Sequence, residues 1–423
     1  MKKHLLALSA AAVLLAPQAV GAEGFSVNEW SAEGFAMGGA RMFAENDAAN
    51  MAYNPASLTK IKGEVAKISA TYISPHGKYK TYGGAGDLLE AGGLNTTSGH
   101  NRVHPAWAPG MYYVKQINDK EWLGFGSYAR FGNSCQFEPG SLPGFNNTSS
   151  KLNGMSVGVN YAKKLDNKWS ASLGAEVNYA WLQIDKTAPF GAGYPAKAQI
   201  EGESYALGWN AAANYAFDDK NEMGIVYRSA VNHSMEANVR DTMLGYALGF
   251  GHGFTEAYGC VTLPESVMIG YGHKFNDKTR VELNGTWTRW SRFDKFAISF
   301  DGMPPFESGV RNWKDGWRYA IGVEHKLSDK YSLLGGIAYD ESSIPDYPEE
   351  GADFMVPTGT RTTFTLGTQY HDEKQTVAFT IGYMKVGDLN IMGAHSASGT
   401  VYEHAKMYDS YTKLVSISYQ YNF

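Results

Sequence analysis

The sequence contains very little cysteine. Only Cys135 and Cys260 occur among its 423 residues, which excludes a disulfide-rich scaffold and leaves a single Cys135–Cys260 bridge as the candidate disulfide. Two unpaired thiols are the alternative. Two distant cysteines with no histidine at ligand spacing make a poor metal site, so we expect no metal and no cofactor.

Long hydrophobic runs are absent beyond the first 22 residues. No later stretch approaches the ~18 consecutive apolar residues of a membrane-spanning helix, and the mean hydropathy is −0.33. An excess of positive charge is also absent, because the formal net charge is −5. The composition therefore excludes a helical membrane protein and gives no indication of a nucleic-acid partner.

The first 22 residues have a different character. Lys2 and Lys3 precede an apolar run at 5–16, and the small-residue site Val20-Gly21-Ala22 follows. This order is typical of a secretory signal peptide, whose apolar core is too short to span a bilayer. We expect residues 1–22 to be removed and the mature chain to start at Glu23.

Aromatic residues and glycine are abundant. Aromatics make up 13% of the chain, and the 48 glycines are expected where strands turn often and backbones pack closely. The last ten residues, LVSISYQYNF, alternate strictly between apolar and polar side chains, which places them on opposite faces of an extended strand. The apolar face holds Val415, Ile417, Tyr419, Tyr421 and Phe423.

Six short polar segments recur every 44 to 58 residues. Each combines Asp, Asn, Ser or Glu with a lysine between two alternating runs, which predicts a tight turn between antiparallel strands. Longer irregular segments lie between the turns, so we expect short turns at one end and long loops at the other. The turns are at 117–120, 165–168, 217–220, 275–278, 327–330 and 371–374.

Six turns join twelve strands, and strands near 64–73 and 410–423 bring the total to fourteen. An even number of strands, short turns on one side and aromatic strand ends are typical of a bacterial outer-membrane barrel. Only helices and closed sheets can satisfy their backbone groups inside a bilayer. A soluble β-propeller is the alternative, but the sequence has no blade motif that repeats in one direction. The predicted fold class is all-β, a 14-stranded antiparallel transmembrane β-barrel spanning 63–423.

Residues 23–62 do not alternate and are rich in glycine, alanine and large apolar side chains. A barrel of fourteen strands is too wide to be filled by its own side chains. We therefore expect this segment to be a hatch inside the lumen; a periplasmic tail is the alternative. Within it, Pro55 suits the first position of a helix and Asn54 suits the cap, so Asn54-Pro55-Ala56 predicts a rigid corner rather than a ligand contact.

Several short motifs occur in an order that resembles the FadL-type family of outer-membrane transporters of long-chain fatty acids and aromatic hydrocarbons. The resemblance covers essentially the whole mature chain. Its motifs are Gly24-Phe25, Asn28-Glu29-Trp30-Ser31 with Gly34, Asn54-Pro55-Ala56, Trp107-Ala108-Pro109, Leu263-Pro264-Glu265, Thr288-Arg289-Trp290 with Phe293, Trp313-Lys314-Asp315 with Arg318-Tyr319, and Gly336 to Asp340 with Pro345.

The resemblance implies four ligand-binding residues. Phe25 matches the third mature residue of the family, whose ring reaches the ligand, and Asp340 matches an acidic residue of its pocket. Arg311 stands where the family has an acidic residue, and Lys186 lies near an expected arginine. A lumen-facing solvated charge is the alternative for Lys186 and Asp340.

The resemblance also implies an opening in the barrel wall. The third strand carries Gly124 and Gly126 where the family has an inward kink, and a glycine within a strand marks a bulge or a close backbone approach. An oily ligand would then leave sideways into the bilayer.

Three predicted outer loops, at 142–145, 188–195 and 243–250, are unusually apolar. Exposed apolar patches often mark a binding site, although loops that pack only on one another are the alternative. In the resembling family such loops form a low-affinity groove. The groove candidates are Phe145, Phe190, Leu244, Leu248 and Phe250.

No hydrolase or dinucleotide motif occurs in a suitable context, so we predict a protein that is not an enzyme; a barrel enzyme with a Ser–His pair is the alternative. The predicted function is a passive channel for hydrophobic molecules, with long-chain fatty acids as the first candidate cargo and aromatic hydrocarbons as the second. An aqueous porin or an adhesin-type barrel is the second hypothesis. The predicted location is the outer membrane of a Gram-negative bacterium, as a monomer surrounded by outer-membrane lipid and lipopolysaccharide.

Overall fold

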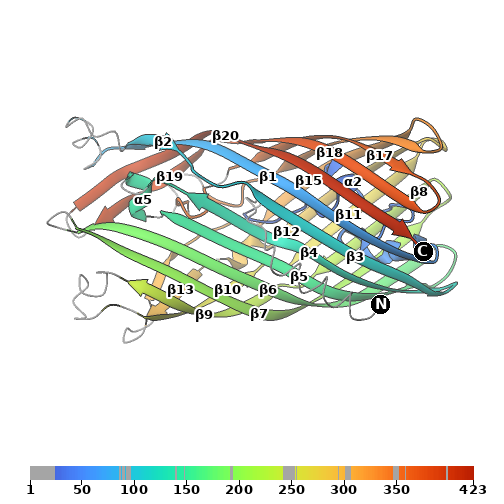
Figure 1. Ribbon diagram of the computed structural model, residues 1–423, viewed down its shortest axis with the longest axis horizontal. Coiled ribbons are helices and arrows are strands. Elements are labelled where there is room, and N and C mark those ends of the chain that lie inside the picture. The colour runs from blue at the N-terminus through green and yellow to red at the C-terminus, as the bar shows by residue number, and fades with distance from the viewer. Residues whose placement is uncertain are drawn as a thin grey trace.

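The computed structural model is a closed barrel whose lumen is filled by the N-terminal segment (Figure 1). It describes residues 24–84, 87, 91, 97–138, 141–146, 148–190, 194–241, 253, 255–293, 295–300, 306–345, 352–357, 359–396 and 399–423. The predicted signal peptide and the groove candidates Leu244, Leu248 and Phe250 lie outside the described residues.

Fourteen antiparallel strands form the wall, as predicted. Five of them are interrupted once and so appear as two elements each: β8/β9, β10/β11, β12/β13, β14/β15 and β18/β19. The short β2 pairs with the outer part of β1. The elements are β1 (Glu64–Tyr82), β2 (Ser98–His100), β3 (Ala106–Asn118), β4 (Glu121–Gln136), β5 (Ser149–Lys164), β6 (Trp169–Phe190), β7 (Tyr194–Ala216), β8 (Asn221–Arg228), β9 (Val231–Asp241), β10 (Glu256–Leu263), β11 (Ser266–Lys274), β12 (Thr279–Thr288), β13 (Lys295–Phe300), β14 (Phe306–Val310), β15 (Gly316–Lys326), β16 (Tyr331–Asp340), β17 (Arg361–His371), β18 (Gln375–Val386), β19 (Leu389–Ser396) and β20 (Gly399–Asn422).

The barrel closes where the first strand meets the last. β1 pairs antiparallel with β20 from Val65 opposite Asn422 to Tyr82 opposite His404. Closure removes both free edges of the sheet, so every strand has two neighbours.

All six predicted turns are present. They gather at the end of the barrel that also holds the C-terminus, on the right in Figure 1, which we call the turn end; the opposite end is the loop end. A side-chain oxygen near the start of each turn accepts hydrogen bonds from backbone N–H groups two or three residues later, as in the bond from Lys168 N to Asp166 Oδ1 (2.7 Å). The same bond is made to Asn118, Asp218, Asn276, Ser328 and Asp372.

The outer and inner faces of the wall differ as the alternation predicts. On β20, Ile417 is 52% exposed, whereas the intervening Ser416 and Ser418 are buried. The buried side chains contact the hatch: Ala32 N donates to Ser418 Oγ (2.7 Å) and Ala48 N donates to Gln420 Oε1 (3.0 Å). The polar face therefore supplies hydrogen-bond partners to the hatch.

The hatch occupies the lumen from residue 24 up to β1. It contains the short helices α2 (Ala32–Ala36) and α3 (Asn50–Tyr53) and the 3₁₀ helix η1 (Pro55–Lys60). Two further short helices, α5 (Leu142–Asn146) and η3 (Trp290–Arg292), lie outside it. Nearly every hatch residue is buried, so the segment is a plug and not a tail.

Glycines of the wall make room for the hatch. A Cβ added to Gly336 of β16 would lie 2.2 Å from the carbonyl carbon of Met37, and one added to Gly124 of β4 would lie 2.4 Å from Met51 Sδ. The hatch thus approaches the wall more closely than a side chain at either glycine would permit.

No helix among the described residues is long and apolar enough to cross a membrane.

Candidate functional site

The ring of Phe25 sits in a box of aromatic side chains. Its centroid lies 4.7 Å from that of Trp290, 5.1 Å from Phe293, 6.0 Å from Phe131 and 6.1 Å from Trp313, at steep interplanar angles. Edge-to-face pairs of this kind contribute beyond the area that they bury. Gly24 precedes the box with φ +61°, and a Cβ there would lie 2.7 Å from the Trp290 ring.

An apolar cavity of about 40 Å³ lies beside the Phe25 box. A space of this size holds about three water molecules, so an acyl chain can enter only if rings of the box move. The single guanidinium of Arg311 also lines it. Its other lining residues include Leu152, Leu182, Val261, Phe293, Met355 and Val356.

Arg311 is held by neighbours. Its Nη1 forms an ion pair with Asp353 Oδ2 (2.6 Å), and its guanidinium lies 5.9 Å from the centroid of the Phe293 ring. The structure therefore brings the predicted residues Phe25 and Arg311 to one cavity. An apolar space with two cations at its edge, Arg311 and Lys151, suits an amphiphile with an anionic group.

Asp340 lies elsewhere. It forms an ion pair with Arg318 across the β15–β16 ladder (2.9 Å), and Arg318 Nη2 donates to the carbonyl of Gly38 in the hatch (2.6 Å). Both residues line a separate cavity of about 10 Å³ together with Glu29. The structure therefore does not bring Asp340 to the cavity beside Phe25, and a role of Asp340 in ligand binding stays a prediction. Lys186 belongs to β6, but its side chain is not among the described ones.

Glu29 is a partly buried acid that sequence reasoning did not single out, although it belongs to a quoted hatch motif. Burial raises the pKa of the Glu29 carboxyl, and this outweighs the opposing hydrogen bond from Asn28 N (3.0 Å) and the charge of Arg318. A hatch acid that gains a proton more readily than usual therefore faces the Arg318–Asp340 pair.

Asn54 forms the corner that the sequence predicts. Ala56 N donates to Asn54 Oδ1 (3.1 Å), which caps η1, and Pro55 occupies the first position of that helix. The Asn54 amide also donates to Met42 O (3.1 Å) and to Asn214 Oδ1 on β7 (2.7 Å). The corner thus connects two parts of the hatch with the wall.

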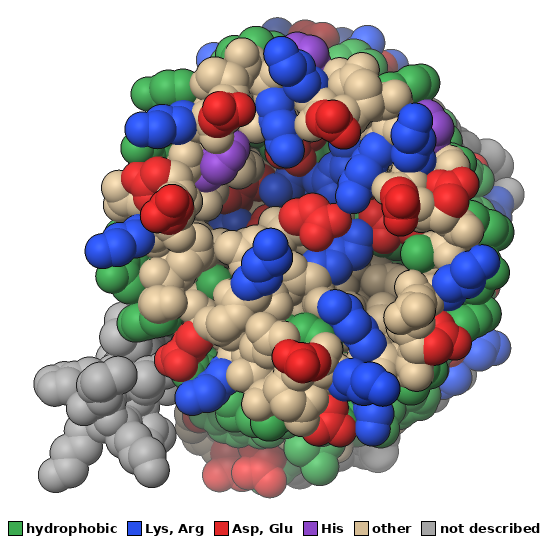
Figure 2. Space-filling view, turned by 90° about the vertical axis from the view of Figure 1, so that its right-hand side faces the viewer, with side chains coloured by type: hydrophobic (Ala, Val, Ile, Leu, Met, Phe, Trp, Pro, Cys, Tyr) green, Lys and Arg blue, Asp and Glu red, His purple; other side chains and the backbone are tan. Residues whose placement is uncertain are grey.

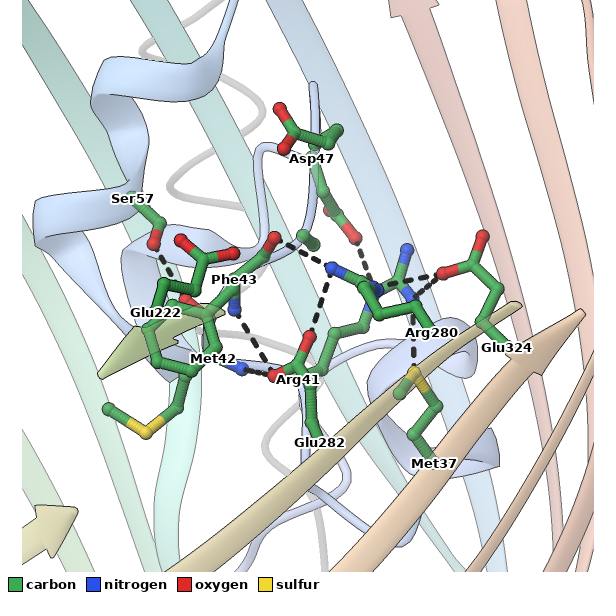
Figure 3. Close-up of polar contacts among 12 residues, drawn as sticks. Met37, Arg41, Met42, Phe43, Asp47, Ser57, Glu222, Arg280, Glu282 and Glu324 are labelled. Carbon is green, nitrogen blue, oxygen red and sulfur yellow. Dashed lines mark hydrogen bonds and ion pairs between the residues drawn. The ribbon is translucent and has the colours of Figure 1, made fainter. Parts of the chain in front are cut away.

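A network of buried charges joins the hatch to the wall near the turn end (Figure 3). Arg41 of the hatch binds Asp47 (3.0 Å) within the hatch and Glu324 (3.2 Å) on β15. Glu282 of β12 accepts from the backbone N–H of Met42 (2.6 Å) and pairs with Arg280 (3.0 Å). Burial of these groups makes each partner costly to remove.

The turn end itself is charged at its rim. Figure 2 looks onto this end and shows lysine, arginine and acidic side chains around a hollow. Lys60 of the hatch pairs there with Glu222 of β8 (2.6 Å) and with Glu45 (3.4 Å), which also binds Lys274 (3.2 Å). Since these pairs are partly exposed, we expect them to contribute less to the stability of the docked hatch than the buried network does.

β4 keeps its ladder with β5 to its end but loses its pairing with β3 and bonds to the hatch instead. Its ladder with β3 ends at Tyr128 opposite Gly110, and a bulge at Arg130 interrupts its ladder with β5. Beyond that point β4 bonds to the hatch: Val27 N donates to Arg130 O (2.9 Å) and Gly132 N donates to Phe25 O (2.8 Å). Every residue from Gly126 to Cys135 is buried, which indicates that both faces of this part of β4 are covered.

The β3–β4 ladder consequently stops before the loop end of β3. In the described part of the chain, residues 106–109 of β3 have no ladder partner on β4, and the next backbone contact is from Arg102 N to Gln136 O (2.7 Å). Gly124 and Gly126 lie in the regular ladder below, where they accommodate Met51. The irregularity of β4 therefore begins at Arg130 and not at the glycines, and an opening in the wall at this strand stays a prediction.

The groove candidates are only partly visible. Phe145 belongs to α5, and Phe190 is the last residue of β6, directly opposite Tyr194 of β7. The side chains of Phe145 and Phe190 are outside the described ones. Part of the segment predicted as a loop at 188–195 is thus an extension of the β6–β7 hairpin.

The predicted disulfide is absent. Both cysteines are free; Cys135 is buried on β4, whereas Cys260 is exposed on β10. One thiol lies in the covered part of β4 and the other lies on the exterior, so the two cannot meet while the wall is intact. Among the described residues, no group of three or more His, Cys, Asp and Glu could hold a metal ion.

Comparison with known proteins agrees with this architecture. The family model described as outer membrane protein transport protein (OMPP1/FadL/TodX) matches residues 12–423. The chain is 26% identical over 419 residues to the long-chain fatty acid transport protein of Escherichia coli (strain K12), covering 89% of this chain and 91% of the relative. It is 25% identical over 412 residues to outer membrane protein P1 of Haemophilus influenzae, covering 88% and 87%.

Two solved structures share the fold. A Pseudomonas aeruginosa FadL homologue matches with a TM-score of 0.81 at 18% identity, covering 95% of this chain and 100% of that one. The P. putida toluene transporter TodX matches with a TM-score of 0.67 at 14% identity, covering 94% and 99%. The protein resides in the outer membrane of a Gram-negative bacterium. The chain belongs to the outer membrane protein transport protein (OMPP1/FadL/TodX) family.

Proposed function

We propose that this protein is a passive channel for hydrophobic molecules, with long-chain fatty acids as the cargo. The observation that carries the proposal is the junction of β4 with the hatch, which sets the Phe25 box beside the proposed opening in the wall. A ligand held at the box has a short sideways path to the bilayer, whereas the path along the barrel axis is filled by the buried hatch.

The inner surface between the loop end and the box supports an oily cargo. A continuous cluster of buried apolar side chains extends there from the Phe25 box, and it includes Phe137, Ile184, Met235, Val239, Val261 and Phe354. An aqueous porin would line this region with charged and polar groups instead. We propose that outer loops collect the cargo and that this surface passes it to the box.

Sideways release is favourable for such a cargo. Each buried CH₂ is worth ~0.8 kcal/mol, so a long acyl chain would lose most of its binding free energy on entering water. Passage from an apolar lumen into the bilayer avoids that loss and needs no energy source. Because the cavity at the box is nearly closed, the hatch and its first residues must shift for each ligand to pass.

The choice of fatty acids rests on two observations. Arg311 and Lys151 place cations at the edge of the apolar cavity, where a ligand carboxylate can pair with them in competition with Asp353, and the similar protein of Escherichia coli (strain K12) is named a long-chain fatty acid transport protein. Aromatic hydrocarbons are the second candidate, because the matching structures include monoaromatic hydrocarbon channels and the Phe25 box is lined by rings.

A pair of variants tests the sideways path. Deleting Arg130 removes the bulge and should let β4 continue its ladder with β3 along the wall. The same variant carries Glu176→Gln, because Arg130 neutralises the buried Glu176 carboxylate. The control, Arg130→Met with Glu176→Gln, keeps the bulge and loses the same ion pair. We expect uptake of labelled oleate to fall at least tenfold in the deletion variant only. Equal uptake by both variants would refute sideways release.

A further inference from the structure

The outward faces of β18, β20 and β1 change from apolar to basic and aromatic at one level of the barrel. On β20 the exposed Ile417 and Val415 are followed by Lys413 and Tyr411. The register places Lys413 opposite Tyr383 of β18, and it places Tyr411 opposite both Lys385 of β18 and His76 of β1. We call these five residues, His76, Tyr383, Lys385, Tyr411 and Lys413, the basic platform.

Three rings of the basic platform form a row across three strands. The rings of Tyr383 and Tyr411 are 5.7 Å apart at 23°, and those of Tyr411 and His76 are 4.8 Å apart at 9°. The row is therefore a nearly parallel set of ring edges facing outward. Tyrosine and histidine rings combine an apolar body with a polar tip, so a row of their edges suits a sugar or a lipid headgroup at the membrane interface.

The two lysines of the basic platform have no acidic partner. Lys385 and Lys413 are both exposed, and no described carboxylate lies within ion-pair distance of either. Lys413 lies 5.8 Å from the centroid of the Tyr411 ring. Neighbouring lysines differ, because Lys78 pairs with Asp409 (3.0 Å) and Lys406 pairs with Asp388 (2.8 Å). Two unneutralised ammonium groups on adjacent strands form a site for an anion with more than one charge.

The basic platform lies at the outer boundary of the membrane. The outward side chains of β20 are apolar or aromatic from Phe423 at the turn end to Val415. Nine tilted residues of a strand cover roughly 20–25 Å, close to the ~25 Å apolar band of such barrels. Lys413 is the next outward residue, so it stands where the headgroups of the outer leaflet begin.

We propose that the basic platform binds the phosphorylated glucosamine headgroup of a lipopolysaccharide molecule. The two ammonium groups pair with a phosphate, and the ring row Tyr383–Tyr411–His76 supports the sugar. The acyl chains then lie along the apolar wall below, beside Ile381 and Ile417, which are about half exposed. Charge, shape and depth all agree with a phosphorylated glycolipid and not with a soluble anion, which would gain nothing from the apolar wall.

Binding of purified lipid A to the detergent-solubilised full chain tests this proposal by native mass spectrometry. Lys385→Gln with Lys413→Gln should weaken lipid A binding about 20-fold, since each lysine near an anionic lipid surface is worth several-fold in affinity. The matched control is Lys220→Gln with Lys330→Gln, which removes the same charge from exposed turn-end lysines and should change binding less than twofold. Equal weakening by both pairs would overturn the proposal.

Two further measurements distinguish the contribution of the phosphates to lipid A binding from that of the aromatic rings. Dephosphorylated lipid A should bind the unaltered protein as weakly as lipid A binds the double variant. Tyr411→Ala should also weaken lipid A binding, and retention of the heat-resistant folded band on a gel shows that the barrel is intact. If phosphatidylglycerol lost affinity as strongly as lipid A in the double variant, the surface would be a general anionic patch and the proposal would be wrong.

Discussion

Lys67 of β1 reaches into the hatch, where its Nζ lies 2.6 Å from Asp47 Oδ1 and 2.9 Å from Glu33 Oε1, and all three side chains are almost fully buried. One wall cation therefore neutralises two hatch acids. The relationship makes the docking of the hatch depend on a small number of charges that cannot be replaced by water.

Removing this cation should release the hatch. Lys67→Met leaves the buried Glu33 without this partner and Asp47 with Arg41 alone, at a cost of roughly 3–5 kcal/mol. We expect the hatch to become sensitive to protease and the barrel to admit small sugars in a liposome-swelling assay. Lys274→Met is the control, because among the described residues Lys274 forms an ion pair only with the exposed Glu45; this variant should leave permeability unchanged. A sealed Lys67→Met barrel would show that the hatch is held by packing alone.

Acid should loosen the hatch through Asp47. Burial alone would raise the pKa of the Asp47 carboxyl, but Lys67 and Arg41 outweigh it and hold that pKa well below its usual value. A group with a depressed folded-state pKa contributes stability above its unfolded pKa of ~3.9, and this is lost as the pH falls further. Protease resistance of the hatch should persist from neutral pH to about pH 4 and decline below it. The decline should vanish in Asp47→Asn, which would instead be loose at every pH.

Two adjacent glycines of β16 should respond differently to the same substitution. A Cβ at Gly336 would lie 2.2 Å from the Met37 carbonyl carbon, whereas one at Gly335 meets only Thr365 O at 3.9 Å. Gly336→Ala should therefore displace the hatch and lower the unfolding temperature, by an overpacking cost of about 1–3 kcal/mol. Gly335→Ala should have no such effect. Equal behaviour of the two variants would mean that the hatch does not touch this strand.

The Phe25 ring should be needed for uptake but not for folding. Phe25→Ala removes four ring contacts, each worth roughly 0.5–1.5 kcal/mol, and enlarges the cavity. We expect oleate uptake to fall about tenfold while the folded band on a gel is retained. Phe25→Leu keeps most of the apolar volume and should give an intermediate loss. Normal uptake by Phe25→Ala would remove the box from the transport path.

The cysteines provide a simple test of the wall. A maleimide should label the folded protein once, at the exposed Cys260, and Cys260→Ser should abolish the labelling. Unfolding without reductant should expose Cys135 as well, giving two labels. Labelling of neither thiol until a reductant is added would indicate the disulfide that is absent from the structure.

The barrel itself could be predicted because each strand carries its own local signals. Alternation separates the faces, and the polar turns separate the strands, as at 165–168 and 275–278. The hatch could also be predicted, since its apolar residues need a buried place and a wide barrel has an unfilled lumen. These features depend on neighbouring residues, which a sequence displays directly.

The candidate site was harder to predict from the sequence, because it depends on residues that are far apart in the chain. Trp290, Phe293 and Trp313 belong to quoted motifs, yet only the interruptions of two strands bring them to Phe25. The bend at Arg130 arises because the backbone of β4 pairs with β3 before this residue and with the hatch after it. No local sequence pattern predicts such a change of partner. For the same reason the sequence could not show that Asp340 and Phe25 line different cavities, since the partner of Asp340, Arg318, is fixed by the register of the β15–β16 ladder.

The sideways path is tested most directly by photo-crosslinking in isolated outer membranes with a long-chain fatty acid that carries a diazirine. We expect labelled peptides from the Phe25 box and from residues 106–109 of β3, which border the proposed opening. Labelling at Lys60 and Glu222 on the turn-end rim, with none at 106–109, would show that the cargo leaves along the barrel axis and would contradict release through the wall.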